Sequence, residues 1–260
     1  MEHIEKVFIC FSLFFIMEKN NEGEKNSAEE LAKKYGIDLE ALKKEQVKLS
    51  KALLVKDSID FSNVRLIAGI DSVFFGNKII SAVSVITSEG DYRGENDFEV
   101  LENDYYSDKV KFPYIPGFRA YRELPSIMNV LSKMDEKPDL IFVKGHGISH
   151  ERLGLASHLS ILTGIPTIGV SESILDGEVK GDDVILNGKI VGKVFVSKRG
   201  SKPLYISPGN LISVKTALDM TKKFMKEPHK LPEPLHLAHR FSKKVMNELR
   251  GDNKDKEIAD

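Results

Sequence analysis

The sequence places one acidic residue inside an apolar stretch, and this residue is the first candidate for chemistry. Asp71 lies in "VRLIAGIDSVFF", residues 64–75, where most of its neighbours are apolar. A buried carboxylate costs free energy unless it is paired or holds a metal ion. We therefore interpret Asp71 either as a catalytic or metal-binding carboxylate or as a strand-end acid that local backbone amides satisfy.

A lysine and a glycine-flanked histidine follow a later apolar run, "DLIFV". Lys144 stands at the end of that run, where a strand, turn and helix unit usually places its chemistry, and Gly145, His146 and Gly147 come next. Glycines let backbone approach a phosphate closely, and the N-terminus of a helix, expected near Arg152, favours anions. The turn is therefore a weak signal for phosphate binding.

A proline-stiffened segment, "PYIPGFRAYRELP", is the third candidate. Pro113 and Pro116 fix φ near −65° and hold Tyr114 and Ile115 in an extended bend. A wedge that separates bases or stacks on them uses apolar and aromatic side chains of this kind. The alternative is a stiff loop that packs on the core.

The elements that must position these residues change in character along the chain. Helices over 27–36 and 38–55 precede strands over 64–75 and 78–87, which form a hairpin. In the rest of the chain we predict strands within 97–106 and over 139–143, 166–170 and 203–207, and a hairpin over 182–197 that turns at Asn187 and Gly188. We predict helices over 118–133, 152–164, 214–225 and 234–249. This order implies a mixed α/β sheet with helices on both faces and extra N-terminal helices.

The chain also divides by composition. Residues 1–27 combine an apolar leader with a polar segment expected to be flexible, residues 28–250 are expected to form one domain, and the charged tail 251–260 is expected to be disordered. The apolar segment 7–17 is 11 residues long, too short to span a membrane, and a start at Met17 instead of Met1 would remove it. It also lacks the positive flank of a signal peptide.

Charge and cysteine content exclude some classes of protein. The 38 basic and 39 acidic residues nearly balance, so any nucleic-acid binding must come from a local patch. The single cysteine excludes a disulfide framework within the chain and suits a reducing compartment. We therefore expect a cytoplasmic protein. We also expect a monomer.

Taken together, these segments resemble one family, endonuclease V, whose members are metal-dependent endonucleases with a ribonuclease H-like fold that act on deaminated purines. The resemblance runs in order from about residue 45 to residue 247 and includes "QVKLSKALLV", "RLIAGIDSVFF", "PYIPGFRAYRELP", "PLYISPGNLIS" and "KLPEPLHLAH". It implies catalytic carboxylates at Asp71 and Glu123 that hold Mg²⁺ or Mn²⁺, and a catalytic histidine at His239.

The resemblance also implies how a substrate would be held. The ligand would be DNA or RNA containing inosine, cut at the second phosphodiester bond on the 3′ side of the lesion. A wedge and a base pocket would supply the contacts, and the candidate residues are Pro113, Tyr114, Ile115, Pro116, Gly117, Arg122, Gly145, His146 and Gly147.

The sequence departs from the family pattern in two segments. The family turn is D-G-H/Q-G, in which the aspartate is a metal ligand, but this chain has Lys144 there. After "PTIGV" the family usually has alanine and lysine, whereas this chain has Ser171 and Glu172. Exchanging a carboxylate for an ammonium changes the local charge by two units, each worth roughly 4 kcal/mol at about 4 Å with an effective dielectric of about 20. Ordinary magnesium binding should therefore be impaired.

Three interpretations remain open. In the first, the exchange is reciprocal: Glu172 supplies the missing carboxylate, Lys144 contacts phosphate, and cleavage with Mg²⁺ or Mn²⁺ persists. In the second, Lys144 takes the place of the metal and pairs with Asp71, Glu123 or Glu172, which leaves a catalytically silent protein that binds nucleic acid. In the third, the chain is a folded relic with a structural or partner-binding role.

Overall fold

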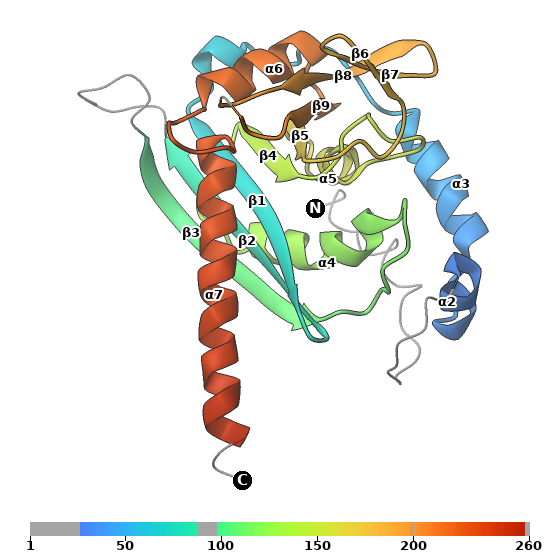
Figure 1. Cartoon of the computed structure of the whole chain (residues 1–260), viewed down its shortest axis with the longest axis vertical. Helices are drawn as coiled ribbons and strands as arrows, with labels where there is room; N and C mark the ends of the chain where they lie inside the picture. Colours follow the sequence, from blue (N-terminus) through green and yellow to red (C-terminus); the bar gives the residue numbers. More distant parts are fainter. Residues whose placement is uncertain (1–26, 88–97, 199, 258–260) are drawn as a thin grey trace.

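The structure is a computed structural model that describes residues 27–87, 98–198 and 200–257 (Figure 1). The predicted apolar leader and nearly all of the polar segment after it lie outside the described residues. None of the helices in the described ranges is long and apolar enough to cross a membrane.

Two N-terminal helices, α2 (Ala28–Lys34) and α3 (Leu39–Ser50), open the described chain, as predicted. A capping box begins α2: the Ser27 hydroxyl accepts from the Glu30 amide at 3.3 Å, and the Glu30 carboxylate accepts from the Ser27 amide at 2.9 Å. Helix α3 ends five residues before the predicted position. There the Leu54 amide donates to the Asn210 side chain at 2.7 Å instead of to a helical carbonyl.

Nine strands form one mixed sheet in the order β3-β2-β1-β4-β5-β9-β8-β7-β6. Strand β1 pairs antiparallel with β2 and parallel with β4, β4 pairs parallel with β5, and β9 returns antiparallel beside β5. The strands are β1 (Leu66–Phe75), β2 (Lys78–Thr87), β3 (Glu99–Lys109), β4 (Leu140–Lys144), β5 (Thr167–Ser171), β6 (Glu178–Lys180), β7 (Asp183–Leu186), β8 (Lys189–Phe195) and β9 (Leu204–Asn210). The predicted mixed α/β sheet is confirmed.

Helices cover both faces of the sheet, also as predicted. Helices α4 (Arg119–Leu131) and α5 (Leu155–Thr163) pack against one face, and their apolar residues form one core with β1, β2 and β4. Helices α6 (Val214–Lys223) and α7 (Glu233–Glu257) contribute to a second core on the opposite face. In Figure 1, the long helix α7 crosses the strands at the β1–β3 end of the sheet.

Strand alternation places Asp71 and Lys144 on the same face of neighbouring strands. Ile67 of β1 pairs in register with Leu140 of β4, and both residues belong to the core beneath α6 and α7. Because side chains alternate with a period of two, residues four positions further along each strand return to that face. Asp71 and Lys144 therefore lie side by side under α7.

Strand β3 and helix α7 also end at other positions than predicted. Strand β3 runs to Lys109, three residues beyond the predicted end. Helix α7 continues to Glu257, eight residues beyond the predicted end at residue 249. Lys and Glu favour helix, and Gly251 costs about 1 kcal/mol relative to alanine, which does not end a helix that is already formed. The predicted hairpin turn is confirmed: Asn187 and Gly188 have φ of 52° and 73°.

Candidate functional site

The centre of the candidate site is the buried carboxylate of Asp71, whose side chain is 1% exposed. On α7, His239 Nδ1 lies 2.6 Å from Asp71 Oδ2, and the Ser242 hydroxyl lies 3.5 Å from the same oxygen. Lys144 Nζ lies 3.7 Å from Asp71 Oδ2 and 3.2 Å from His239 Nδ1. One carboxylate oxygen is thus surrounded by an ammonium, an imidazole and a hydroxyl.

The groups next to Asp71 Oδ2 are a cation and hydrogen-bond donors. An ionised carboxylate only accepts hydrogen bonds, so the His239 imidazole and the Ser242 hydroxyl act as donors to Asp71 Oδ2, and Lys144 forms an ion pair with it. Mg²⁺ needs such an oxygen as a direct ligand, and the positive charge beside it is already supplied by Lys144. Among the residues that the structure describes, no three His, Cys, Asp or Glu side chains gather into a group that could hold a metal ion.

Glu123, the second predicted ligand, comes from α4 on the other side of the sheet. Glu123 is 2% exposed and forms an ion pair with Arg119, which lies one helical turn earlier. Arg119 Nε contacts Glu123 Oε1, and Arg119 Nη2 lies 3.2 Å from Glu123 Oε2. Burial raises the pKa of Glu123, the charge of Arg119 opposes this shift, and the charge of Asp71 adds to it. Arg119 was not among the predicted residues, although its spacing of four from Glu123 on a helix could have identified it.

Glu172 forms a separate ion pair at the edge of the site. It directly follows β5, its side chain is 52% exposed, and its Oε1 lies 2.5 Å from Lys230 Nζ. The hydrogen bond and charge of Lys230 lower the pKa of Glu172, and Lys144 and His239 contribute in the same direction. Of the three carboxylates predicted to attract Lys144, Asp71 is the one it pairs with. No spacing in the sequence indicated Lys230, which is 58 residues from Glu172.

The predicted wedge is only partly available to a ligand. Tyr114 is 63% exposed, Pro116 is exposed and Pro113 is half-buried. Ile115 is 1% exposed and belongs to a third core formed with aromatic residues and α2. Ile115 is therefore covered by the protein in this structure: in an extended segment neighbouring side chains point to opposite sides, and the branched apolar one is buried.

Arg122 supports the wedge from behind. Its guanidinium lies 4.2 Å from the centre of the Phe74 ring and 5.8 Å from that of the Tyr114 ring. Burial lowers the pKa of Arg122. Arginine above aromatic rings gains cation–π energy and restricts their movement. Arg122, predicted to touch substrate, therefore also holds Tyr114 in place.

A buried polar clamp holds Gly117, the residue after the wedge. Gly117 has φ of 81°, which favours glycine, and its carbonyl accepts from Gln46 Nε2 at 3.0 Å and from Arg152 Nη2 at 3.5 Å. Arg152 Nε in turn donates to Gln46 Oε1 at 2.8 Å, and Gln46 is fully buried. Helix α3 thereby reaches the turn next to Tyr114. Gln46 carried no signal in the sequence, because a polar residue on an amphipathic helix usually faces solvent.

The glycine-flanked turn is packed against the sheet. Gly145 and Gly147 are buried, a Cβ added to Gly147 would overlap the carbonyl group of Pro208, and the Gly145 amide donates to Val170 at 3.0 Å. Gly147 is needed for close approach of the turn to β9, and the Gly145 amide is bonded to β5. His146 stays partly exposed, and burial lowers its pKa.

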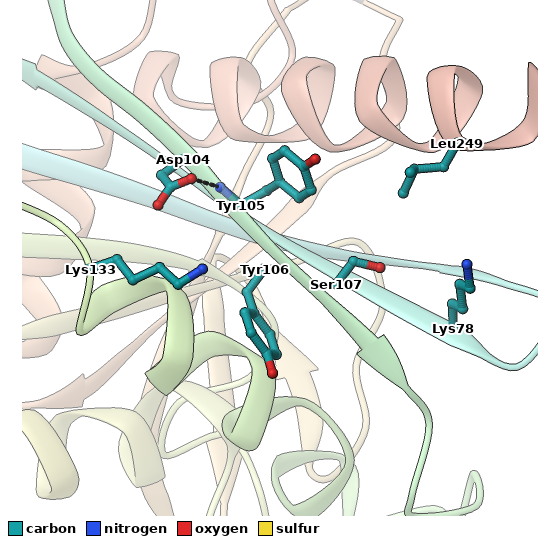
Figure 2. Close-up of a pocket in the computed structure, with 7 residues that line it drawn as sticks. All are labelled: Lys78, Asp104, Tyr105, Tyr106, Ser107, Lys133 and Leu249. Atoms are coloured by element: carbon teal, nitrogen blue, oxygen red, sulfur yellow. Dashed lines mark hydrogen bonds between the residues drawn. The ribbon is translucent and has the colours of Figure 1, made fainter. Parts of the chain in front are cut away.

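A concave surface lies away from these residues at the open edge of the sheet, around β3 (Figure 2). Figure 2 shows Tyr105 and Leu249 on the α7 side of β3 and Lys133 with Tyr106 on the other side. The residues that line this concave surface are Lys78, Asp104, Tyr105, Tyr106, Ser107, Lys133 and Leu249. None of the predicted site residues lines this hollow, so we do not assign the candidate function to it.

The sheet order, the parallel centre and the helices on both faces define a ribonuclease H-like α/β domain. Residues 47–240 match the family model for endonuclease V. The chain is 35% identical over 217 residues to endonuclease V of Dictyoglomus turgidum, covering 80% of this chain and 91% of that protein. It is 36% identical over 208 residues to endonuclease V of Nostoc punctiforme, covering 76% and 90%. The chain therefore belongs to the endonuclease V family.

Solved structures agree with the fold. Endonuclease V from Bacillus subtilis superposes with a TM-score of 0.74 at 23% identity, over 83% of this chain and 94% of that one. Endonuclease V from Ciona intestinalis, crystallised with DNA containing an inosine, gives a TM-score of 0.72 at 23% identity, over 81% and 98%. At this level of identity the likeness concerns the fold alone.

Proposed function

We propose that this endonuclease V homologue binds nucleic-acid strands containing inosine and does not cut them by the ordinary Mg²⁺- or Mn²⁺-dependent reaction. The observation that carries the proposal is the position of Lys144 Nζ, 3.7 Å from Asp71 and 3.2 Å from His239. A divalent ion would have to remove an ammonium from the carboxylate that it needs as a ligand. The incoming ion must lose part of its tightly held water, and an ammonium that stays nearby repels it.

Retained binding is supported by the exposed parts of the site. Tyr114 stands on a stiff segment, backed by Arg122, and presents an aromatic ring on which a base can stack. A relative from Ciona intestinalis was crystallised with DNA containing an inosine, which makes this ligand class the first to test. Lys144 and Lys230 supply positive charge near the same edge of the sheet.

One observation favours a second candidate, an active endonuclease. Asp71 and His239, the carboxylate and histidine that the family resemblance assigns to catalysis, are in contact at 2.6 Å. If Lys144 moved away on metal binding, this pair and Glu123 would be the remaining catalytic groups. The two candidates differ in their response to a chelator and to replacement of Lys144.

The test compares binding and nicking of labelled inosine-containing strands, as DNA and as RNA, in EDTA and with Mg²⁺ or Mn²⁺. Wild type should prefer inosine strands over undamaged ones in EDTA and should leave them intact with either metal. Lys144→Asp should gain metal-dependent nicking, and adding Glu172→Lys tests whether the second exchanged position matters. Nicking by wild type that Asp71→Ala abolishes would establish the second candidate. A protein that neither binds nor cuts would be a structural relic.

A further inference from the structure

The ion pair between Glu172 and Lys230 joins two segments beside the candidate site. Glu172 follows β5, Lys230 precedes α7 by three residues, and their atoms are 2.5 Å apart. The side chains are 52% and 27% exposed, so the pair faces solvent. An exposed ion pair of this kind contributes little to stability and exchanges readily with other charged partners.

Glu172 also lies in the field of the cations around Asp71. Lys144 and His239 act on it electrostatically in addition to Lys230. Lys144 is the last residue of β4, and it pairs in register with Val170 of β5, two residues before Glu172. A single exposed carboxylate is therefore bonded to Lys230 and lies in the electrostatic field of Lys144 and His239.

We propose that Glu172 occupies the place of a nucleic-acid backbone phosphate in the free protein, and that Lys230 binds this phosphate once Glu172 has moved away. Carboxylate and phosphate oxygens accept hydrogen bonds from an ammonium in the same way. The site keeps its cations ordered through Glu172, and a phosphodiester then replaces the carboxylate. This inference rests on the proposed binding of nucleic acid and names the group that contacts the backbone.

The mechanism makes a prediction about selectivity. Backbone contacts position a strand but carry no base information. Removing the competing carboxylate should therefore tighten binding to inosine strands and to undamaged strands by the same factor. A change confined to inosine strands would instead place Glu172 at the base pocket and would overturn the proposal.

The experiment measures Kd by fluorescence anisotropy in EDTA at low salt for wild type, Glu172→Gln and a matched control, Glu178→Gln. Glu178 pairs with Lys180 at 2.6 Å on β6, at the far end of the sheet, so its variant makes the same change of charge away from the site. Glu172→Gln should lower Kd roughly twofold to fivefold, as expected for releasing an exposed ion pair. Glu178→Gln should bind as wild type does.

A double variant identifies the cation that is released. Lys230→Gln should weaken binding and reduce the slope of log K against log salt by about one. In the Lys230→Gln background, Glu172→Gln should no longer increase affinity. A gain that persists without Lys230, or a Glu172→Gln affinity equal to that of Glu178→Gln, would overturn the inference while leaving the proposed function intact. No binding by wild type or by Glu172→Gln would overturn both.

Discussion

In the wild type, the Lys144 ammonium neutralises Asp71. In the Lys144→Asp variant, a divalent ion should be needed to neutralise the two carboxylates. Asp71 and the new carboxylate would lie on neighbouring strands and on the same face, with His239 as the remaining partner. At 3.7 Å and an effective dielectric of about 20, the lost attraction amounts to roughly 4 kcal/mol. Lys144 is 26% exposed and His239 stays in place, so we expect Lys144→Asp to lower the free energy of unfolding by about 2–3 kcal/mol in EDTA.

Divalent metal should then restore part of this loss. A ligand present at about ten times its Kd stabilises the folded state by about 1.4 kcal/mol. In a chain of this size, that corresponds to a rise in Tm of roughly 3–6 °C. Wild type should show no such rise, because its ammonium already neutralises Asp71.

The assay is thermal unfolding of wild type, Lys144→Asp and Lys144→Met, each in EDTA, MgCl₂ and MnCl₂. Lys144→Met removes the ammonium without adding a carboxylate. It therefore separates the loss of repulsion between the ammonium and the divalent ion from the gain of a carboxylate ligand. Its Tm should rise less with metal than that of Lys144→Asp. An equal rise in Tm for wild type and Lys144→Asp would mean that a divalent ion binds beside the lysine. That result would refute the argument from charge and would favour an active endonuclease.

Three further predictions concern other parts of the fold. Burial lowers the pKa of His158 to about 4, below its unfolded value of roughly 6.5, so the contribution of His158 to stability is complete above about pH 6.5 and falls by roughly 3 kcal/mol as the pH drops to about 4. Urea unfolding across this range should show a smaller loss of stability for His158→Met. An unchanged loss would mean that other groups cause the pH dependence. Tyr114→Ala should reduce the preference for inosine strands about tenfold in competition binding, with stability within about 0.5 kcal/mol of wild type, and unchanged discrimination would count against the wedge. Gly69→Ala should lower the free energy of unfolding by more than about 2 kcal/mol, because the added methyl group would overlap the Pro234 carbonyl. Gly251→Ala, on α7 with open space around it, should raise the free energy of unfolding by about 0.5–1 kcal/mol. Similar unfolding free energies for the two variants would contradict this packing.

Sequence patterns could predict the sheet and the side of the sheet on which a residue lies. Both follow from local rules: apolar runs indicate strands, and the period of two assigns Asp71 and Lys144 to faces. A turn at Asn187 and Gly188 likewise follows from the tolerance of these residues for positive φ. Where the expected element had a strong local signal, the structure contains it.

What could not be predicted are the contacts between distant segments. The pairing of Lys230 with Glu172 and the clamp of Gln46 on Gly117 join residues 58 and 71 positions apart. Ile115 illustrates the same limit, because the residues that bury it come partly from α2. Composition along the chain indicates that a residue can be buried, but the partner is determined by how the elements pack.

The charges at the candidate site occur in pairs, and this pairing bears on which function costs least. Asp71, Glu123 and Glu172 each have their own cation: Lys144, Arg119 and Lys230 respectively. Binding Mg²⁺ would require freeing at least one buried carboxylate, Asp71 or Glu123, from its partner. Binding a phosphodiester requires freeing only a cation. The Glu172–Lys230 pair is exposed, so replacing the Glu172 carboxylate by a phosphate at Lys230 costs little free energy. Holding a backbone phosphate through Lys230 therefore requires less rearrangement of ion pairs than binding Mg²⁺ at Asp71 or Glu123.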